Sequence, residues 1–225
     1  MEHYFTNNDN LKSELRDIKF SYNEYDFMFK SDNGVFSKNE VDYGSLFLVK
    51  TFLSSNNIEN IKSILDVGCG YGFIGITLSK ILGVHTDMVD VNKRAVHLAK
   101  MNIGLNKVDA SSFLSNVYSN VTNTYDLIIT NPPIRAGKQV VLNILLGGLE
   151  RLNDNGELWF VIRKKQGAES IGREVSKHYY FYIIKKSKGF FILCAKNVKR
   201  YWKILTTRVN NDKILNWWRI CFFRN

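Results

Sequence analysis

The chain has 225 residues, of which 45% are hydrophobic and 23% are charged, as in a soluble globular protein with one substantial domain. It contains no run of about 18 apolar residues that would span a membrane, and its first ten residues are too polar for a signal peptide. The three cysteines have no metal-ligand spacing, so we expect a cytoplasmic protein without a metal site. The net charge of +10 favours a polyanionic partner such as RNA, and it fits a protein from a lysine- and asparagine-rich proteome equally well.

Residues 1–60 are predicted to form a β-hairpin and a helix. Apolar and polar residues alternate through most of 18–30, with two polar residues in the middle, which is typical of paired strands. A turn signal, DNG, follows at 32–34, and the apolar spacing of 42–53 predicts the helix. Packing on the core explains most of these residues, and Phe36 is the one that we single out as a candidate for contact with a ligand.

Residues 64–75, ILDVGCGYGFIG, combine a strand, a glycine-rich turn and the start of a helix. Gly68, Gly70 and Gly72 stand at alternate positions, where glycine allows a positive φ or a close approach of the backbone to a ligand. Asp66 lies in the strand just before this turn. The pattern predicts a site for a nucleotide-like ligand, and by itself it also fits a dinucleotide-binding site.

A second carboxylate, Asp90, follows the next predicted strand, residues 84–89. Its separation from the glycine turn is about that at which a carboxylate binds the ribose hydroxyls of a nucleotide, and a solvated carboxylate at a strand end is the alternative. The following helix is predicted for residues 92–102, with Asn92 as its N-cap.

Residues 107–124 give the weakest pattern, with one short strand that begins at Val108. The apolar strand at 126–130 is followed directly by NPP at 131–133. The two prolines fix φ and remove two backbone donors, which leaves a stiff turn that is rich in hydrogen-bond acceptors. A nicotinamide-binding fold has no use for such a turn, so the dinucleotide interpretation loses its support.

The rest of the chain continues the alternation of helices and strands. Apolar residues after Gly137 predict a long helix, and a turn at Asn155-Gly156 leads into a strand at 157–162. The basic cluster at 163–165 follows at the carboxyl end of that strand, where open α/β sheets bind ligands, although a solvated loop is equally compatible with it.

The last segments differ in character. Residues 166–177 are predicted to be helical, and the aromatic-rich segments 178–184 and 189–195 are predicted to be an antiparallel pair of strands at the edge of the sheet. Residues 197–225 carry seven Lys or Arg and one Asp, interleaved with aromatic residues. This composition suits single-stranded RNA, a membrane interface or packing against the domain, and we assign the segment no role.

Three of these motifs together resemble the class I S-adenosylmethionine-dependent methyltransferases: DVGCGYG at 66–72, VDVN at 89–92 and TNPPI at 130–134. They are similar in particular to the branch that methylates exocyclic amines. The resemblance implies a Rossmann-like α/β fold with a seven-stranded, mostly parallel sheet, an antiparallel edge strand and an N-terminal β-hairpin. Residues 61–196 would then form the methyltransferase domain, and 197–225 a basic aromatic extension.

A further resemblance narrows the substrate. DNGVFS at 32–37, D-x-G-S at 42–45 and NPPIRAGK at 131–138 are similar to segments of the small bacterial ribosomal RNA guanine-N2 methyltransferases, and this resemblance covers 3–196. In the relatives that act on adenine or glutamine the residue after NPP is aromatic, whereas here it is Ile134. The difference argues against adenine and more weakly against glutamine.

The resemblance implies S-adenosylmethionine as the cofactor, with its methionine part at the glycine turn and its ribose at Asp90. Asn116 stands where the family usually has an aspartate that accepts the adenine amino group, and its amide oxygen can accept that hydrogen bond without a charge. The expected cofactor-binding residues are Asp66, Gly68, Gly70, Gly72, Asp90 and Asn116.

For catalysis, the Asn131 side-chain oxygen and the Pro132 carbonyl are expected to accept hydrogen bonds from the target amine and to localise its lone pair. No strong general base is required, and the sequence shows no Ser-His-Asp or Cys-His set. Phe36 would stack on the base or cover the cofactor, and Arg135 and Lys138 would hold phosphates, with a solvated loop as the alternative. The expected substrate-binding residues are Phe36, Pro133, Ile134, Arg135 and Lys138.

The sequence therefore predicts a methyltransferase that acts on guanine N2 of small-subunit ribosomal RNA, as a monomer or weak dimer, with the RNA or the small subunit as its partner. One alternative is a methyltransferase for another exocyclic amine or for a protein glutamine. A second alternative is a catalytically silent RNA-binding factor for ribosome assembly, against which the intact motif residues argue.

Overall fold

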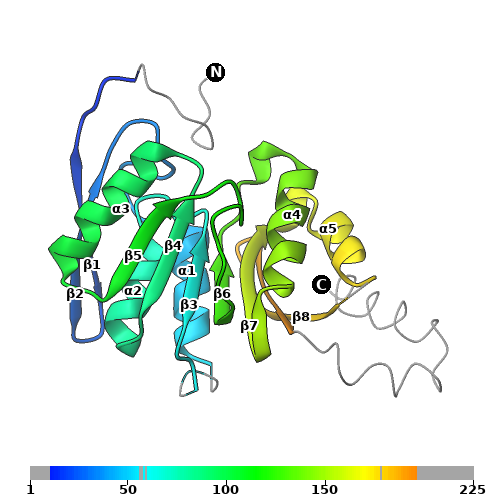
Figure 1. Cartoon of the computed structure of the whole chain (residues 1–225). Coiled ribbons are helices and arrows are strands. Elements are labelled where there is room, and N and C mark those ends of the chain that lie inside the picture. The colour runs from blue at the N-terminus through cyan, green and yellow to red at the C-terminus, as the bar shows by residue number, and fades with distance from the viewer. Residues whose placement is uncertain (1–10, 56–57, 59, 178, 197–225) are drawn as a thin grey trace, which may run out of the picture.

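The structure is a computed structural model that describes residues 11–55, 58, 60–177 and 179–196 (Figure 1). The strands are β1 (Arg16–Tyr22), β2 (Tyr25–Ser31), β3 (Ile64–Val67), β4 (Thr86–Asp90), β5 (Ala110–Leu114), β6 (Tyr125–Thr130), β7 (Leu152–Arg163), β8 (Tyr180–Ser187) and β9 (Phe190–Lys196). The α-helices are α1 (Tyr43–Leu53), α2 (Phe73–Leu82), α3 (Lys93–Asn106), α4 (Lys138–Leu149) and α5 (Ala168–Val175). Two short 3-10 helices are η1 (Ile134–Ala136) and η2 (Lys164–Gln166).

A seven-stranded sheet with the strand order β5-β4-β3-β6-β7-β9-β8 forms the centre of the molecule, and the β1-β2 hairpin lies at one side of it (Figure 1). The pairs β5-β4, β4-β3, β3-β6 and β6-β7 are parallel. Strand β9 is antiparallel to both β7 and β8. This arrangement confirms the predicted Rossmann-like fold, with the antiparallel β8-β9 pair at one edge and the N-terminal hairpin.

The two faces of the sheet bury separate hydrophobic cores, because successive residues of a strand point to opposite faces. Ile64 of β3 and Trp159 of β7 pack with residues of α1, α2 and α3. Their neighbours Leu65 and Leu158 pack with residues of α4 and α5. Each large apolar side chain buried in this way contributes about 1.5–3 kcal/mol to folding, so the sheet is a firm base for the loops at its carboxyl edge.

Helix α1 carries part of the N-terminal segment to that edge. Asp42 is its N-cap, and the Asp42 side chain accepts a hydrogen bond of 2.9 Å from the Ser45 backbone N–H. Phe52 packs edge-on against Trp159 of β7, with the ring centroids 5.1 Å apart. The contact anchors α1 on the sheet, while its first turn lies beside Asn131 at the end of β6.

Two asparagines of α3 hold the hairpin in place. Asn102 accepts a hydrogen bond from the Lys30 N–H (2.7 Å) and donates one to the Lys30 carbonyl (2.9 Å), and Asn106 does the same with Met28 (3.1 and 2.7 Å). The two amides therefore satisfy the backbone of β2 as a neighbouring strand would. Asn102 also donates to the Tyr71 carbonyl (2.8 Å), which connects the hairpin to the glycine turn.

Most predicted elements are present with shifted bounds. The helix predicted at 92–102 extends to Asn106, where Lys107 takes a left-handed conformation with φ of 53°. The weak segment 107–124 contains β5, which pairs with β4. The helix predicted at 166–177 is shorter, because η2 precedes α5. In the described ranges no helix is long and apolar enough to cross a membrane.

The turn predicted at Asn155-Gly156 is wrong as a strand boundary, because β7 already begins before it. The pairing of β6 with β7 shifts register between Tyr125 and Leu127, so the segment is an irregularity inside one long strand. Asn155 has φ of 66°, and a Cβ at Gly156 would lie 2.9 Å from the Tyr125 carbonyl oxygen. Local turn residues therefore serve here to bend a strand.

Two predictions about organisation stay predictions. The division between 1–60 and 61–196 is one of them, although the hairpin and α1 pack directly on α3 and on the sheet. The extension at 197–225 lies outside the described residues.

Candidate active site

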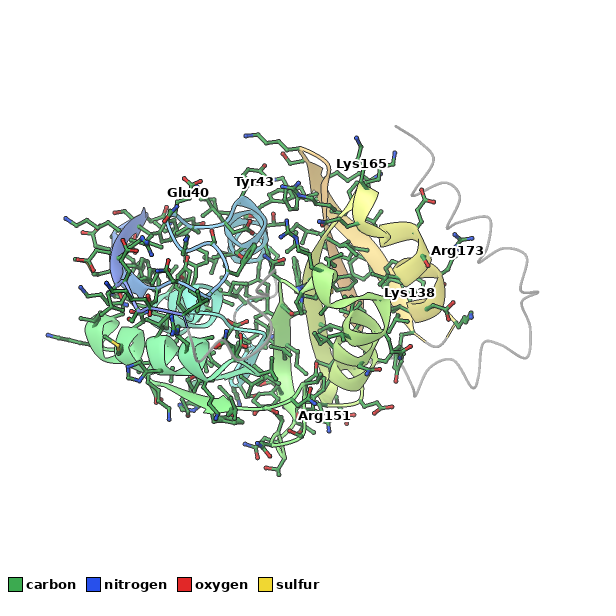
Figure 2. All side chains as sticks on the ribbon, turned by 90° about the horizontal axis from the view of Figure 1, so that it is seen from above. Glu40, Tyr43, Lys138, Arg151, Lys165 and Arg173 are labelled. Carbon is green, nitrogen blue, oxygen red and sulfur yellow. The ribbon has the colours of Figure 1, made fainter. Side chains whose placement is uncertain are left out.

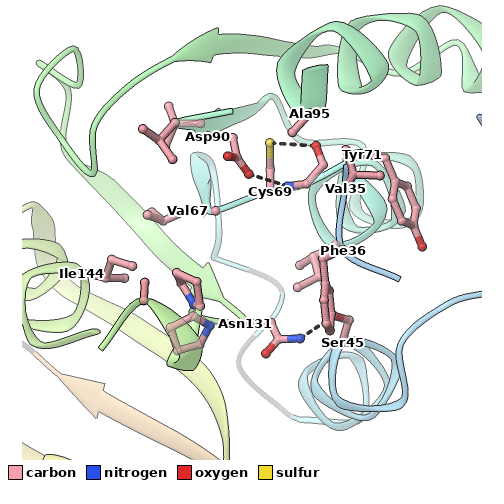
Figure 3. Close-up of a pocket in the computed structure, with 18 of the residues that line it drawn as sticks. Val35, Phe36, Ser45, Val67, Cys69, Tyr71, Asp90, Ala95, Asn131 and Ile144 are labelled. Carbon is pink, nitrogen blue, oxygen red and sulfur yellow. Dashed lines mark hydrogen bonds between the residues drawn. The ribbon is translucent and has the colours of Figure 1, made fainter. Parts of the chain in front are cut away.

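A cavity of about 290 Å³ opens at the carboxyl ends of β3, β4 and β6 (Figure 3). This is the edge at which open α/β sheets bind their ligands, because the loops that follow the parallel strands converge there. The walls of this first cavity come from the turn after β3, the end of β4, the segment after β5 and the NPP turn after β6. The part of the chain that the structure describes contains no cluster of three or more side chains suited to holding a metal ion.

The glycine turn forms one wall of the first cavity. Gly68 and Gly70 have φ of 72° and 57°, and apart from the chain neighbours no atom of the described residues lies within 4 Å of the place of a Cβ at either residue. The backbone therefore takes a conformation that other residues rarely adopt, and it meets the cavity without a side chain. The N–H groups of Gly68 and Cys69 both donate to the Val89 carbonyl (2.8 and 3.0 Å), which fixes the turn on β4.

Asp90, the last residue of β4, also lines the first cavity. Its Oδ2 accepts a hydrogen bond of 2.9 Å from the Gly70 N–H (Figure 3). Its Oδ1 accepts one of 2.9 Å from the Asn92 N–H. Removal from water raises the pKa of Asp90, and these hydrogen bonds oppose that rise. The carboxylate is thus a fixed acceptor in the cavity wall. Asn116, in the segment after β5, lines the same cavity.

Two residues predicted to bind the cofactor lie outside the cavity wall. Asp66 is fully buried, its Oδ2 accepts a hydrogen bond from the Gly75 N–H (2.9 Å), and its Oδ1 has no partner among the described residues. Burial, with a smaller effect of the Asp90 charge, raises the pKa of Asp66 to about 7. Gly72 is the N-cap of α2 with φ of 92°, and a Cβ there would lie 2.8 Å from the Ile76 Cδ1 atom, so this glycine serves the backbone turn and the packing at the start of α2.

Asn131 faces the first turn of α1. Its Nδ2 donates to Asp42 Oδ2 (3.0 Å) and to Ser45 Oγ (2.9 Å), and Figure 3 shows the side chain directed at Ser45. The two amide hydrogens are thereby used, whereas Oδ1 accepts no hydrogen bond from any described residue. The amide is held in one orientation, and its oxygen is a preorganised acceptor. Asn131 and Pro132 both line the cavity.

A second cavity, of about 570 Å³, adjoins the first. Six residues at the junction line both cavities: Val35, Phe36, Ser37, Asp42, Asn131 and Pro132. The walls of the second cavity carry three basic side chains, Lys38, Arg135 and Arg163, and two acidic ones, Glu40 and Asp42. The Arg163 guanidinium lies over the Phe190 ring at 4.4 Å from its centroid.

Further basic side chains lie on the same half of the molecule as α4 and α5. Seen from above, Lys138, Lys165 and Arg173 are on this half, and Glu40 and Tyr43 lie on the α1 side (Figure 2). Lys188 extends over the Tyr43 ring at 4.8 Å from its centroid. Of all these basic residues, Lys38, Arg135 and Arg163 line the second cavity itself.

The residues predicted to bind the substrate divide between the cavities. Pro133 lines the first cavity, and Ile134 and Arg135 line the second. Phe36, with 39% of its surface exposed, lines both. Lys138 is the exposed first residue of α4 and lines neither cavity.

Sequence reasoning gave no role to Asp42 or Ser45, although both contact Asn131. The segment 42–45 was visible only as part of a resemblance, and the N-cap position of Asp42 explains an acidic residue there without any function. Arg163 was visible as one member of a basic cluster. Its place in the second cavity wall could not be distinguished from a solvated loop before the fold was known.

Comparison with known families decides the class of protein. The family described as "Methyltransferase small domain" matches residues 26–194. The chain belongs to this family. A similar protein of Bacillus subtilis (strain 168), the uncharacterized protein YbxB, is 43% identical over 202 residues, which make up 88% of this chain and 99% of that one.

Other similar proteins are named ribosomal RNA small subunit methyltransferase C. That of Serratia proteamaculans (strain 568) is 35% identical over 153 residues, which are 65% of this chain and 43% of the relative. That of Buchnera aphidicola subsp. Acyrthosiphon pisum (strain APS) is 32% identical over 173 residues, which are 75% of this chain and 49% of the relative. The chain therefore spans about half of these longer relatives or less.

Solved structures agree on the fold. The 16S rRNA N2 methyltransferase RsmC of T. thermophilus, in complex with AdoMet and guanosine, matches with a TM-score of 0.74 and 24% identity over 83% of this chain and 51% of that one. The ribosomal protein L11 methylase of Lactobacillus delbrueckii subsp. bulgaricus matches with a TM-score of 0.60 and 19% identity over 71% of this chain and 84% of that one. These likenesses establish the class I methyltransferase fold.

The methyltransferase small domain family is a class I family that uses S-adenosylmethionine, so the predicted cofactor is confirmed. The first cavity fits this cofactor by the chemistry of its walls. It offers glycine backbone without side chains, a fixed carboxylate at the end of the second parallel strand, and apolar residues between them.

Proposed function

We propose that this methyltransferase transfers a methyl group to the N2 amine of a guanine in small-subunit ribosomal RNA. The observation that carries the proposal is the fixed orientation of Asn131, whose Nδ2 donates to Asp42 and Ser45 and whose Oδ1 remains an acceptor where the two cavities meet. The Pro132 carbonyl is a second acceptor next to it. Two neighbouring acceptors match the two N–H bonds of a primary amine.

The two cavities would hold the two reactants. When bound, S-adenosylmethionine supplies an electrophilic methyl group on a positively charged sulfur. We assign its methionine part to the turn at Gly68 and Gly70, its ribose to Asp90 and its adenine to Asn116, all in the first cavity. The target base would enter from the second cavity and place its amine at Asn131.

The residues of the NPP turn then have a defined chemical task. The guanine N2 lone pair is delocalised into the ring, and hydrogen bonds to Asn131 Oδ1 and the Pro132 carbonyl orient the amine so that this lone pair points at the methyl group. The N–C bond forms as the C–S bond breaks, the sulfur keeps the electron pair, and the amine then releases one proton to water. Each fixed acceptor stabilises the positive charge on the amine by about 3 kcal/mol if it acts as strongly as an oxyanion-hole donor.

RNA as the substrate is supported by charge. Three cationic side chains, Lys38, Arg135 and Arg163, line the second cavity against two acidic ones, and the chain carries a net charge of +10. Two of the similar proteins bear the name of small-subunit ribosomal RNA methyltransferases. The base must leave its stack to reach the amine-binding acceptors, and Phe36, which lines both cavities, would stack on it. A ribosomal substrate would place the reaction in the cytoplasm.

The test is transfer of labelled methyl groups from S-adenosylmethionine to separate candidate substrates: unmodified small-subunit RNA, unmodified small subunits and a release factor with a glutamine acceptor. We expect label in the RNA, recovered as N2-methylguanosine after digestion to nucleosides. Label found only in the protein would show that the substrate is a glutamine side chain and not RNA. Cofactor binding without label in any substrate would support the catalytically silent assembly factor.

A further inference from the structure

Among the described residues, only one side-chain oxygen of Asp42 accepts hydrogen bonds. Oδ2 accepts from the Ser45 N–H (2.9 Å), from the Ser45 hydroxyl (3.4 Å) and from Asn131 Nδ2 (3.0 Å). Oδ1 accepts none from the described residues, and it is not among the side-chain atoms there that are both buried and unpaired. Asp42 lines both cavities. Asp42 Oδ1 is therefore available to accept a hydrogen bond next to the proposed amine site, because no hydrogen bond of the described residues uses it.

We propose that this second oxygen of Asp42 recognises the target base by accepting the N1–H of guanine. The inference rests on the proposed function, because it concerns the base whose N2 amine lies at Asn131. On the edge of guanine, N1–H and the N2 amine are neighbouring donors. Asp42 and Asn131, joined by their own hydrogen bond, offer two neighbouring acceptors. The donor pattern of the base and the acceptor pattern of the site agree.

Other amines lack this pattern. Adenine and cytosine carry an unprotonated ring nitrogen beside the exocyclic amine, and this nitrogen would face the carboxylate as acceptor against acceptor. A glutamine side chain places a carbonyl oxygen beside its amide nitrogen, with the same conflict. Sites built to hydrogen-bond a substrate group reject analogues that lack it, because a polar group is left unpaired. The arrangement therefore selects guanine and favours RNA over a glutamine-bearing protein.

The variant Asp42→Asn tests recognition of the base separately from the two structural roles of Asp42, which are to cap α1 and to orient Asn131. Asparagine is as good an N-cap as aspartate, so α1 keeps its first turn. The Ser45 N–H and Asn131 Nδ2 both need an oxygen at the position of Oδ2, so the new amide nitrogen must occupy the position of Oδ1. The variant keeps the orientation of Asn131 and replaces an acceptor toward the base by a donor.

The experiment compares two bases on the full-length protein. Labelled transfer first maps the methylated nucleotide, and ligated RNAs then carry either guanine or 2-aminopurine there. 2-Aminopurine retains the 2-amino group and has an unprotonated N1. We expect the wild type to prefer guanine in kcat/KM by about 100-fold or more, and Asp42→Asn to reduce this preference by about tenfold or more, mainly through loss on guanine. Glu24→Gln, which removes the same charge in the exposed hairpin turn away from both cavities, should leave the preference within about twofold of the wild type.

The outcomes are distinct for the two proposals. An equal loss on both bases in Asp42→Asn would show that Asp42 only positions Asn131, which overturns the recognition and leaves the guanine methyltransferase standing. No label in any RNA with the wild type would overturn the proposed function and the recognition with it. Asp42→Ser caps α1 but is too short to reach the base; if the Asn variant does not fold, the same loss of preference is expected from it.

Discussion

Asn131 Nδ2 lies 3.0 Å from Asp42 Oδ2, although 89 residues separate the two in the sequence. Asn131 follows β6, and Asp42 caps α1. The hydrogen bonds that begin the helix and those that orient the proposed acceptor of the target amine therefore form one network. We therefore expect substitutions in the first turn of α1 to lower the rate of methyl transfer more strongly than the free energy of unfolding.

Ser45→Ala tests this connection. The change removes one of the two acceptors of Asn131 Nδ2 and leaves Asp42 as the other. Loss of one hydrogen bond worth about 1 kcal/mol should lower kcat about fivefold, with the dissociation constant of S-adenosylmethionine unchanged in calorimetry. Ser54→Ala, at the other end of α1, is the control and should keep the wild-type kcat. Similar losses in both variants would trace the effect to helix stability instead.

Gly70→Ala and Gly72→Ala should impair the protein in different ways. Gly70 lines the first cavity with φ of 57° and open space around its Cβ position, so alanine adds backbone strain of about 1–2 kcal/mol and a methyl group at the cavity wall. We expect cofactor affinity to fall about tenfold or more in titrations. At Gly72, with φ of 92°, the new Cβ would also meet Ile76 Cδ1 at 2.8 Å and the Ala99 Cβ and Met88 Sδ atoms at 3.4 Å, so we expect the unfolding free energy to fall by more than in Gly70→Ala, by about 1 kcal/mol. The reverse pattern in denaturation and titration would contradict these assignments.

The buried carboxyl group of Asp66 should make the protein less stable as the pH rises from about 4 to about 7. The folded-state pKa of about 7 lies above the ordinary value of 3.8, so in this window the folded state holds a proton that the unfolded state has released. The unfolding free energy then decreases with rising pH and levels off above about pH 8. Asp66→Asn removes this ionisation, so its urea-unfolding free energy should lose this part of the pH dependence. Parallel curves for wild type and variant would refute the prediction.

Arg163→Ala should weaken the interaction with RNA and leave cofactor binding intact. The guanidinium lines the second cavity, where the nucleic acid would approach. If it contacts one phosphate, KM for RNA should rise about three- to tenfold and the slope of log affinity against log salt should decrease by roughly one. Lys177→Ala, which breaks only an exposed ion pair with Glu174, is the control. An unchanged salt slope in Arg163→Ala would remove this residue from the RNA-binding surface.

The features that could be predicted from the sequence are those set by a few adjacent residues. The glycine turn follows from the φ values that glycine allows, and both Gly68 and Gly70 have them. The position of Asp90 at the end of a strand follows from the apolar run before it, and the NPP turn from the geometry of proline. These local rules were enough for the order of the elements and for a nucleotide-like ligand, whereas S-adenosylmethionine itself followed from the resemblance to the methyltransferases.

The features that could not be predicted depend on packing across the chain. Asp42 reaches Asn131 because α1 is anchored on β7, in part by Phe52 against Trp159, and no local pattern reports this contact. Asp66 is buried because strand alternation turns its side chain toward α2, away from the cavity. Lys138 misses both cavities because η1 and Gly137, with φ of 99°, carry the chain away before α4 begins.

The most direct test of the central claim is the rate of methyl transfer in Asn131→Ala, measured in a single turnover with saturating S-adenosylmethionine and unmodified small subunits. Asn143→Ala, an exposed asparagine-to-alanine change on α4, is the matched control. We expect Asn131→Ala to be slower by more than about tenfold, a loss of roughly 1.4 kcal/mol or more, with cofactor affinity and the control rate unchanged. A rate within about twofold of the wild type would contradict the assignment of Asn131 as the acceptor of the target amine.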